Sequence, residues 1–170
     1  NVEALRFQRT AIDGLLRRLA DDPRWRTTVA TTPDRPTGWL RGRATAAAQG
    51  RGDLGRRLTR IARRFPTGRL VIIGSDTPAI RRADIAAAFD ALRSHDAVVG
   101  PARDGGYWLI GLRRSARGPL PFDRVRWSSP DTLADTLARL AGMRTARLRV
   151  LEDVDDLASY RRFTAGAQRP

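Results

Sequence analysis

Short apolar segments alternate along this chain with segments of helical periodicity, and this alternation restricts the possible folds more than any other feature. Runs rich in Val, Ile and Leu predict strands, whereas apolar residues spaced three and four apart predict helices. The expected strands cover 24–32, 69–75, 96–101, 106–112 and 145–151, and the expected helices cover 1–20, 53–65, 80–93 and 130–141, with a last helix from Asp155 or Asp156. The sequence therefore predicts an α/β fold with a mostly parallel sheet flanked by helices, in a single domain over residues 1–170.

A formal net charge of +14 raises nucleic acid as a partner, because basic side chains neutralise phosphates and release counterions. All 32 basic residues are Arg, which is typical of a GC-rich, bacterial-type coding sequence. The arginines occur as scattered pairs without interleaved aromatic residues, so an ordinary solvated surface accounts for them. A nucleic-acid-binding module is therefore kept as an alternative and is not the favoured interpretation.

The chain contains no cysteine, which excludes disulfides, thiolate metal sites and thiol catalysis. No apolar run reaches the roughly 18 residues that identify a membrane-spanning helix. The amphipathic, Arg-rich start of the chain carries acidic residues, so we interpret it as a surface helix rather than a transit peptide. These features predict a cytoplasmic protein without a membrane span.

The segment RLVIIGSDTPAI, at 69–80, ends a buried strand on the carboxylate of Asp76. A charge at the end of a buried strand is costly unless something compensates it, and a hard cation with oxygen ligands is one such compensation. Asp76 is therefore a candidate metal ligand. The alternative is that it caps the turn through Thr77 and Pro78 into the next helix.

A second segment, RLRVLEDVDDL at 147–157, repeats the pattern of a strand followed by carboxylates. Asp153 and Asp155 lie two residues apart, so their side chains point to the same side if the chain is still extended there. Together with Asp76 they would form a site for Mg²⁺ or Mn²⁺ that leaves positions open for phosphate oxygens. Asp156 is the predicted N-cap of the last helix.

The segment GPARDGGYWLIGL, at 100–112, places Asp104, Gly105 and Gly106 between two apolar runs, which predicts a tight β-hairpin. Glycine supplies the positive φ that such turns require, and it also lets a ligand approach the backbone closely. A turn alone and a turn that lines a site together with Tyr107 explain the motif equally well. If a site is present, Asp104 is the candidate for orienting or deprotonating an acceptor hydroxyl group.

A glycine-rich loop, QGRGDLGRR at 49–57, leads into a predicted helix with Asp53 as its N-cap. Such a segment offers free backbone N–H groups to a phosphate or a nucleobase, and Arg56 and Arg57 add positive charge. The alternative is a plain flexible loop.

His95 and Trp127 are the remaining residues that could take part in catalysis or binding, and we interpret both as structural. His95 has no second histidine or cysteine near it in the sequence, so we interpret it as structural and expect no zinc site or histidine-based triad. Trp127 precedes a predicted helix with Ser129 as its N-cap, and its indole is expected to close the core rather than to bind substrate.

Four segments taken in order, VIIGSDTPAI, GPARDGGYWLIGL, VRWSSPDTLADTLARL and LEDVDDLASY, resemble the glycosyltransferase-A-like family of the former domain of unknown function 2064. Its members are called selenodomain-associated or arsenosugar-biosynthesis glycosyltransferases. The similarity covers nearly the whole chain and is strongest from Gln49 to Tyr160. That family is similar in fold to the Rossmann-like nucleotide-diphospho-sugar transferases, including the 2-phospho-L-lactate guanylyltransferases.

The resemblance implies roles for particular residues. It implies that Asp76, Asp153 and Asp155 hold a divalent cation, Mg²⁺ or Mn²⁺, and that an acceptor lies near Asp104 to Tyr107, where Asp104 is the candidate catalytic residue. It also implies two groups of binding residues. The nucleotide-binding candidates are Gly52, Asp53, Leu54, Gly55, Arg56 and Ser75, and the substrate-binding candidates are Gly105, Gly106, Tyr107 and Trp127.

The function that these residues favour is a metal-dependent transferase acting on an activated nucleotide, with glycosyl transfer from a sugar nucleotide to a small acceptor. The alternatives are nucleotidyl transfer to a small phosphorylated acceptor and a non-catalytic interaction domain. Family members usually begin with a strand and a Pro-Gly-x-Val-Lys-Thr-Arg-Leu type loop, which this chain lacks. We therefore expect the natural gene product to extend upstream of Asn1 and residues 1–170 to bind nucleotide poorly.

Overall fold

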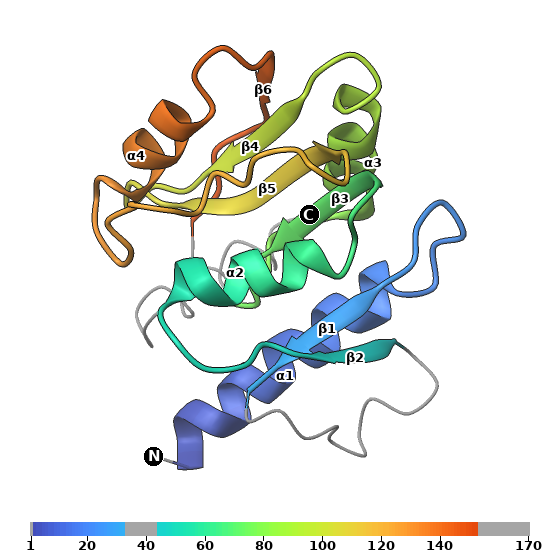
Figure 1. Ribbon diagram of the computed structural model, residues 1–170. Helices are drawn as coiled ribbons and strands as arrows, with labels where there is room; N and C mark the ends of the chain where they lie inside the picture. Colours follow the sequence, from blue (N-terminus) through green and yellow to red (C-terminus); the bar gives the residue numbers. More distant parts are fainter. Residues whose placement is uncertain (1, 33–43, 153–170) are drawn as a thin grey trace.

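The computed structural model describes residues 2–32 and 44–152, in an order of elements that follows the predicted alternation (Figure 1). The elements are α1 (Val2–Leu19), β1 (Thr28–Thr31), β2 (Thr45–Ala48), α2 (Leu54–Arg63), β3 (Gly68–Ile73), α3 (Arg82–Ala91), β4 (Ala97–Pro101), β5 (Tyr107–Arg114), α4 (Thr132–Arg139) and β6 (Thr145–Arg147).

The larger sheet has four strands in the order β3-β5-β4-β6. β5 pairs antiparallel with both β3 and β4, whereas β4 pairs parallel with β6. Strands β3, β4 and β6 therefore run in one direction, and among the described strands of this sheet β5 runs against them. Because β3 and β4 share a direction, their carboxyl ends lie at the same edge of the sheet, which is where ligands bind in α/β folds.

Helices cover both faces of this sheet. On one face, α3 packs Ile85, Ala88 and Leu92 with Val98 of β4, and α1 adds Leu15 and Leu19. On the other face, α2 and α4 pack against β4 and β5; the buried and half-buried residues there include Leu58, Ala62, Val99, Ile110, Leu112, Leu133 and Leu137. The result is a central sheet between two helical layers, as the sequence predicts.

A β-bulge interrupts the pairing of β4 with β5 beside the predicted hairpin. Gly100 is opposite Leu109 and Pro101 is opposite Tyr107, so Trp108 is the extra residue. A bulge shifts the alternation of side chains by one position, and Tyr107 accordingly packs with Ile110 on the α4 side. Trp108 packs on the α3 side, and its indole Nε1–H donates to the Arg149 carbonyl over 3.1 Å.

Strands β1 and β2 form a separate parallel pair. In Figure 1 this pair lies apart from the four-stranded sheet. Within the described residues, β3 pairs with β5 along one edge, and no strand pairs with its other edge. The residues of β3 line a large cavity, together with β1, Thr45 of β2 and residues of α1, α2 and α3.

Most of the predicted elements are present, with several corrections. The strand expected at 24–32 is limited to Thr28–Thr31, and the strand β2 was not predicted. The strand expected at 145–151 ends at Arg147, although Leu151 still forms a parallel bridge with Ala102.

Helix α4 begins at Thr132 rather than at 130, so the prediction that Ser129 is its N-cap was wrong. The Ser129 hydroxyl instead accepts from the Asp131 N–H over 3.2 Å within the preceding turn. The predicted last helix lies outside the described residues. No helix in the described part of the chain is long and apolar enough to cross a membrane.

Candidate functional site

A cavity of 2170 Å³ lies between the free edge of β3 and the β1–β2 pair, and it reaches the carboxyl ends of β3 and β4. Its walls along the strands and helices are mostly apolar. Its polar lining at the carboxyl edge includes several of the predicted site residues: Ser75, Asp76, Asp104, Gly106, Tyr107 and Trp127. These residues come from three separate parts of the sequence, and the antiparallel pairing of β3 with β5 brings them to one edge.

Asp76 follows β3 and lies exposed at this edge. One of its carboxylate oxygens folds back over Gly74, where a Cβ atom would be 2.5 Å from it, so glycine at 74 makes room for the carboxylate. Among the described residues, Asp76 has no hydrogen-bond or ion-pair partner. Its oxygens are therefore available to a ligand, and the predicted capping of the following turn is not seen. Helix α3 instead begins after Arg81, whose backbone N–H donates to Asp84 over 2.8 Å.

The hairpin between β4 and β5 forms as predicted. The Asp104 carboxylate accepts from the Gly106 N–H over 2.8 Å, so one oxygen of Asp104 holds the turn. Gly105 has φ +89°, and a Cβ atom there would lie 2.2 Å from the Pro130 carbonyl oxygen. Its own carbonyl accepts from the Leu133 N–H over 2.9 Å. The hairpin is thereby fixed against the start of α4, and Asp104 is held in place beside the cavity.

Tyr107 and Trp127 form an aromatic wall below this hairpin. Their rings meet edge to face with centroids 6.4 Å apart, and Trp127 also contacts Phe122. Burial raises the pKa of Tyr107 to about 12, and the nearby Thr136 hydroxyl group has a weaker effect that lowers this pKa. The hydroxyl groups of Tyr107 and Thr136 are both buried without a hydrogen bond of standard geometry. The Tyr107 hydroxyl group therefore points into the core on the α4 side. Tyr107 thus offers its ring, not its hydroxyl group, to the cavity.

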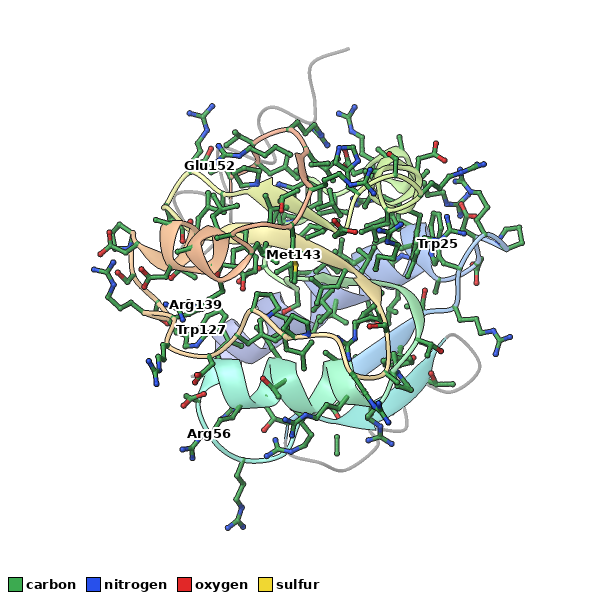
Figure 2. All side chains as sticks on the ribbon, turned by 45° about the horizontal axis from the view of Figure 1, so that its top comes forward. Trp25, Arg56, Trp127, Arg139, Met143 and Glu152 are labelled. Carbon is green, nitrogen blue, oxygen red and sulfur yellow. The ribbon has the colours of Figure 1, made fainter. Side chains whose placement is uncertain are left out.

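The glycine-rich loop lies at the start of α2, where Asp53 caps the helix by accepting from the Arg56 N–H over 2.8 Å. Leu54 lines the cavity, and so does Arg57, which sequence reasoning noted for its charge but did not place among the six nucleotide-binding candidates. The Arg57 Nε–H donates to the Gly52 carbonyl over 2.9 Å. Arg56 lies instead on the outer surface beside α2 (Figure 2), with its side chain 75% exposed.

Five predicted residues do not line the cavity: Gly52, Asp53, Gly55, Gly105 and Arg56. Two of them have a packing role. A Cβ atom at Gly55 would lie 2.6 Å from the Trp127 indole nitrogen, so this glycine lets α2 approach Trp127. Gly105 makes the close approach to Pro130. In the structure these two glycines allow close packing contacts, and their predicted binding roles stay predictions.

The predicted metal site has one of its three ligands, Asp76, in the described part of the chain. Asp153 and Asp155 lie outside the described residues, and within residues 2–32 and 44–152 no three acidic or histidine side chains form a cluster that could hold a metal ion. An exposed, unpaired carboxylate is an oxygen donor of the kind that Mg²⁺ and Mn²⁺ prefer, so Asp76 itself fits such an ion. His95 lies elsewhere, with its Nδ1 3.1 Å from the Ala91 carbonyl oxygen, in keeping with a structural role.

The fold agrees with that of a solved protein. A crystal structure from Desulfovibrio desulfuricans G20, described as a "putative nucleotide-diphospho-sugar transferase", matches with a TM-score of 0.85 and 28% sequence identity. The match covers 99% of this chain and 78% of that chain. The chain therefore has the α/β fold of the nucleotide-diphospho-sugar transferase class, as predicted.

The family is established by sequence. The chain belongs to DUF2064, the family described as "Uncharacterized protein conserved in bacteria", whose model matches residues 15–129. This confirms the family that the four sequence segments indicated. No curated protein matches the chain.

Proposed function

We propose that the protein is a metal-dependent transferase that uses a nucleotide-activated sugar as its donor. The observation that carries this proposal is the cavity at the carboxyl edge of the sheet, which gathers Ser75, Asp76, Asp104 and Arg57 in a fold shared with a nucleotide-diphospho-sugar transferase structure. A position beyond the carboxyl ends of α/β strands is where such folds bind their ligands.

The nucleotide is assigned to the side of the cavity formed by α2. Leu54, at the start of α2, lines the cavity there, and the start of a helix carries partial positive charge, which favours a diphosphate. Arg57 adds a full charge, with its Nε held by Gly52 and its remaining N–H groups free of partners among the described residues. Ser75, directly after β3, offers a hydroxyl group on the other side.

The metal is assigned to Asp76 together with Asp153 and Asp155. When bound, a divalent cation would supply neutralisation of the negative charge that develops on the leaving diphosphate. The carboxylate of Asp76 is suited to this because it is exposed at the cavity and has no described protein partner.

The acceptor is assigned to the hairpin side. In the proposed reaction the acceptor oxygen forms a bond to the anomeric carbon of the sugar, the bond from that carbon to the diphosphate oxygen breaks, and the nucleoside diphosphate leaves with the electron pair. Asp104 receives the proton of the acceptor hydroxyl group. The hydrogen bond from the Gly106 N–H fixes one carboxylate oxygen, which leaves the second oxygen for this role.

The test is ligand-induced thermal stabilisation, because a ligand that binds the folded state raises the melting temperature. UDP, GDP, dTDP and their glucose conjugates are screened with and without Mn²⁺ on the full chain. We expect metal-dependent stabilisation by one nucleotide series. Asp76→Asn should lose the metal dependence, whereas Asp21→Asn, an exposed carboxylate away from the cavity, should keep it.

Stabilisation that is independent of metal, or that survives Asp76→Asn, would remove Asp76 from the metal site. The product then separates the two transferase reactions. Glycosyl transfer from the sugar nucleotide releases a nucleoside diphosphate, whereas nucleotidyl transfer from the corresponding nucleoside triphosphate, added as a second donor, releases pyrophosphate. The absence of stabilisation by any nucleotide would favour the non-catalytic alternative. Binding to a DNA duplex with a steep loss of affinity at high salt would favour the nucleic-acid alternative.

A further inference from the structure

A second, smaller pocket of 350 Å³ lies at the opposite end of β5 from the candidate site. It is lined by Thr59 and Arg63 of α2, by Arg114 at the end of β5, and by residues of the loop that follows, including Arg117. It shares no lining residue with the large cavity. Since a strand rises about 3.3 Å per residue, Arg114 and Tyr107 are about 23 Å apart along β5.

Arg114 is the unusual residue of this pocket. It is 8% exposed, yet among the described residues it forms no ion pair, and its Nε–H is buried without a hydrogen-bond partner. Its one hydrogen bond runs from a terminal N–H to the Gly118 carbonyl over 3.4 Å, at the long end of the normal range. Burying a guanidinium group costs free energy unless the group is paired and hydrogen-bonded. A negatively charged partner would therefore stabilise Arg114.

The charges around Arg114 do not provide that partner. Arg63 and Arg117 line the same pocket and add positive charge. The acidic residue of the lining is Asp123, whose side chain is 87% exposed and faces its neighbour Arg124 at 3.8 Å. Three arginines therefore surround a small space with one solvent-exposed carboxylate beside it, and the Thr59 side chain adds a hydroxyl group at its wall.

We propose that this pocket binds a phosphate group, held by the Arg114 guanidinium with Arg63 and Arg117 at its rim. A guanidinium fork presents paired N–H donors that match the oxygens of a phosphate, and such charge-assisted bonds are among the strongest in proteins. The phosphate would satisfy the buried Nε–H and balance the charge of Arg114. The pocket is separate from the proposed transferase site, so this inference does not depend on the proposed function.

The experiment is calorimetric titration of the full chain with inorganic phosphate, in chloride buffer at constant ionic strength. We expect saturable binding whose Kd rises at least about tenfold in Arg114→Gln and in Arg117→Gln, because each loses a charge-assisted contact. Arg117 is exposed, so its variant keeps the proposal testable if Arg114→Gln does not fold. Arg147→Gln is the matched control, because Arg147 is exposed and lies outside the pocket.

The outcomes separate the possible sources of the signal. Absence of saturable binding, or equal weakening in Arg147→Gln, would overturn the proposal. Loss of binding in Arg57→Gln with normal binding in Arg117→Gln would also overturn it, since the phosphate would then occupy the large cavity.

Glycerol 3-phosphate serves as a second titrant. Tighter binding than that of inorganic phosphate would assign the pocket to a phosphomonoester, and tighter binding of inorganic phosphate would assign it to the free ion.

Discussion

The four-stranded sheet and the β1–β2 pair differ in how they are held in the molecule. All five residues of β4 are buried, as are six of the eight residues of β5, and both faces of these strands are covered by helices. No residue of β1 is buried, and β2 buries Ala47. The pair is joined by its own backbone ladder and by the contact of the Thr28 and Thr45 hydroxyl groups at 2.8 Å.

This difference separates a well-packed part of the molecule from a less buried part, and both parts line the cavity. The candidate catalytic residue Asp104 and the aromatic wall belong to the well-packed sheet, whereas the opposite wall of the cavity belongs to β1 and β2. The proposed catalytic residue thus lies on the well-packed part, in agreement with the general requirement for preorganised sites.

The largest expected effect comes from removing a core side chain of the sheet. Ile110→Ala in β5, a residue 1% exposed, should lower the free energy of unfolding by about 2 to 5 kcal/mol, because it removes buried methyl groups and leaves a cavity. Val29→Ala in the half-buried β1 should cost about 1 kcal/mol, since less apolar area is lost. Urea denaturation of both variants measures the difference. Equal losses would contradict the distinction between the two regions.

A smaller effect is expected at the hairpin that joins the sheet to the candidate site. Gly105→Ala should cost about 2 to 4 kcal/mol, because its φ of +89° disfavours a side chain and the new Cβ atom would overlap Pro130. Gly142→Ala is the matched control, with φ +83° and no atom within 4 Å of a Cβ. It should cost about 1 to 2 kcal/mol from backbone strain. Thermal unfolding of both variants measures the packing contribution, and equal shifts would show that Pro130 moves away.

The smallest effect concerns an ion pair that fixes the turn before α4. Hydrogen bonds from the Arg126 side chain, and then from its backbone N–H, lower the pKa of Asp135 from its ordinary value of 3.8 to about 2. Since this pKa is lowered on folding, the contribution of Asp135 is present above about pH 4 and is lost as the pH falls toward 2. The urea midpoint of the wild type should therefore exceed that of Asp135→Asn at neutral pH and converge with it near pH 2.

The exposed Asp21→Asn variant is the control for this titration, and it should follow the wild type throughout. A constant gap between the wild type and Asp135→Asn across the pH range would contradict the assigned ion pair.

Much of the fold follows from the sequence because the sheet side is strongly patterned. The apolar runs of β3, β4 and β5 and the Asp104-Gly105-Gly106 turn have few alternatives in conformation, so the bounds of these strands were predicted to within two residues. Strand β2 was missed because three of its four residues are alanines, which favour helices and rarely form strands. Its pairing with β1 is a tertiary property that no local pattern encodes.

The candidate site was predicted less completely, for a physical reason that two residues illustrate. Asp76 could be found because a carboxylate after an apolar run is unusual wherever it occurs. Arg56 and Arg57 are adjacent and chemically identical, and only the orientation of α2 decides that Arg57 lines the cavity while Arg56 faces outward. The bulge at Trp108, which turns Tyr107 toward α4, likewise has no local sequence signal.

The central position of the β4–β5 hairpin has a consequence for the order in which the chain folds. Its two strands are joined by a short connection, so they can pair early, before β3 and β6 are added at their outer edges. The hairpin would then be formed in the folding transition state, whereas the β1–β2 pair would dock late. Ile110→Ala is accordingly expected to slow refolding, and Val29→Ala to act chiefly by accelerating unfolding, as stopped-flow kinetics can distinguish.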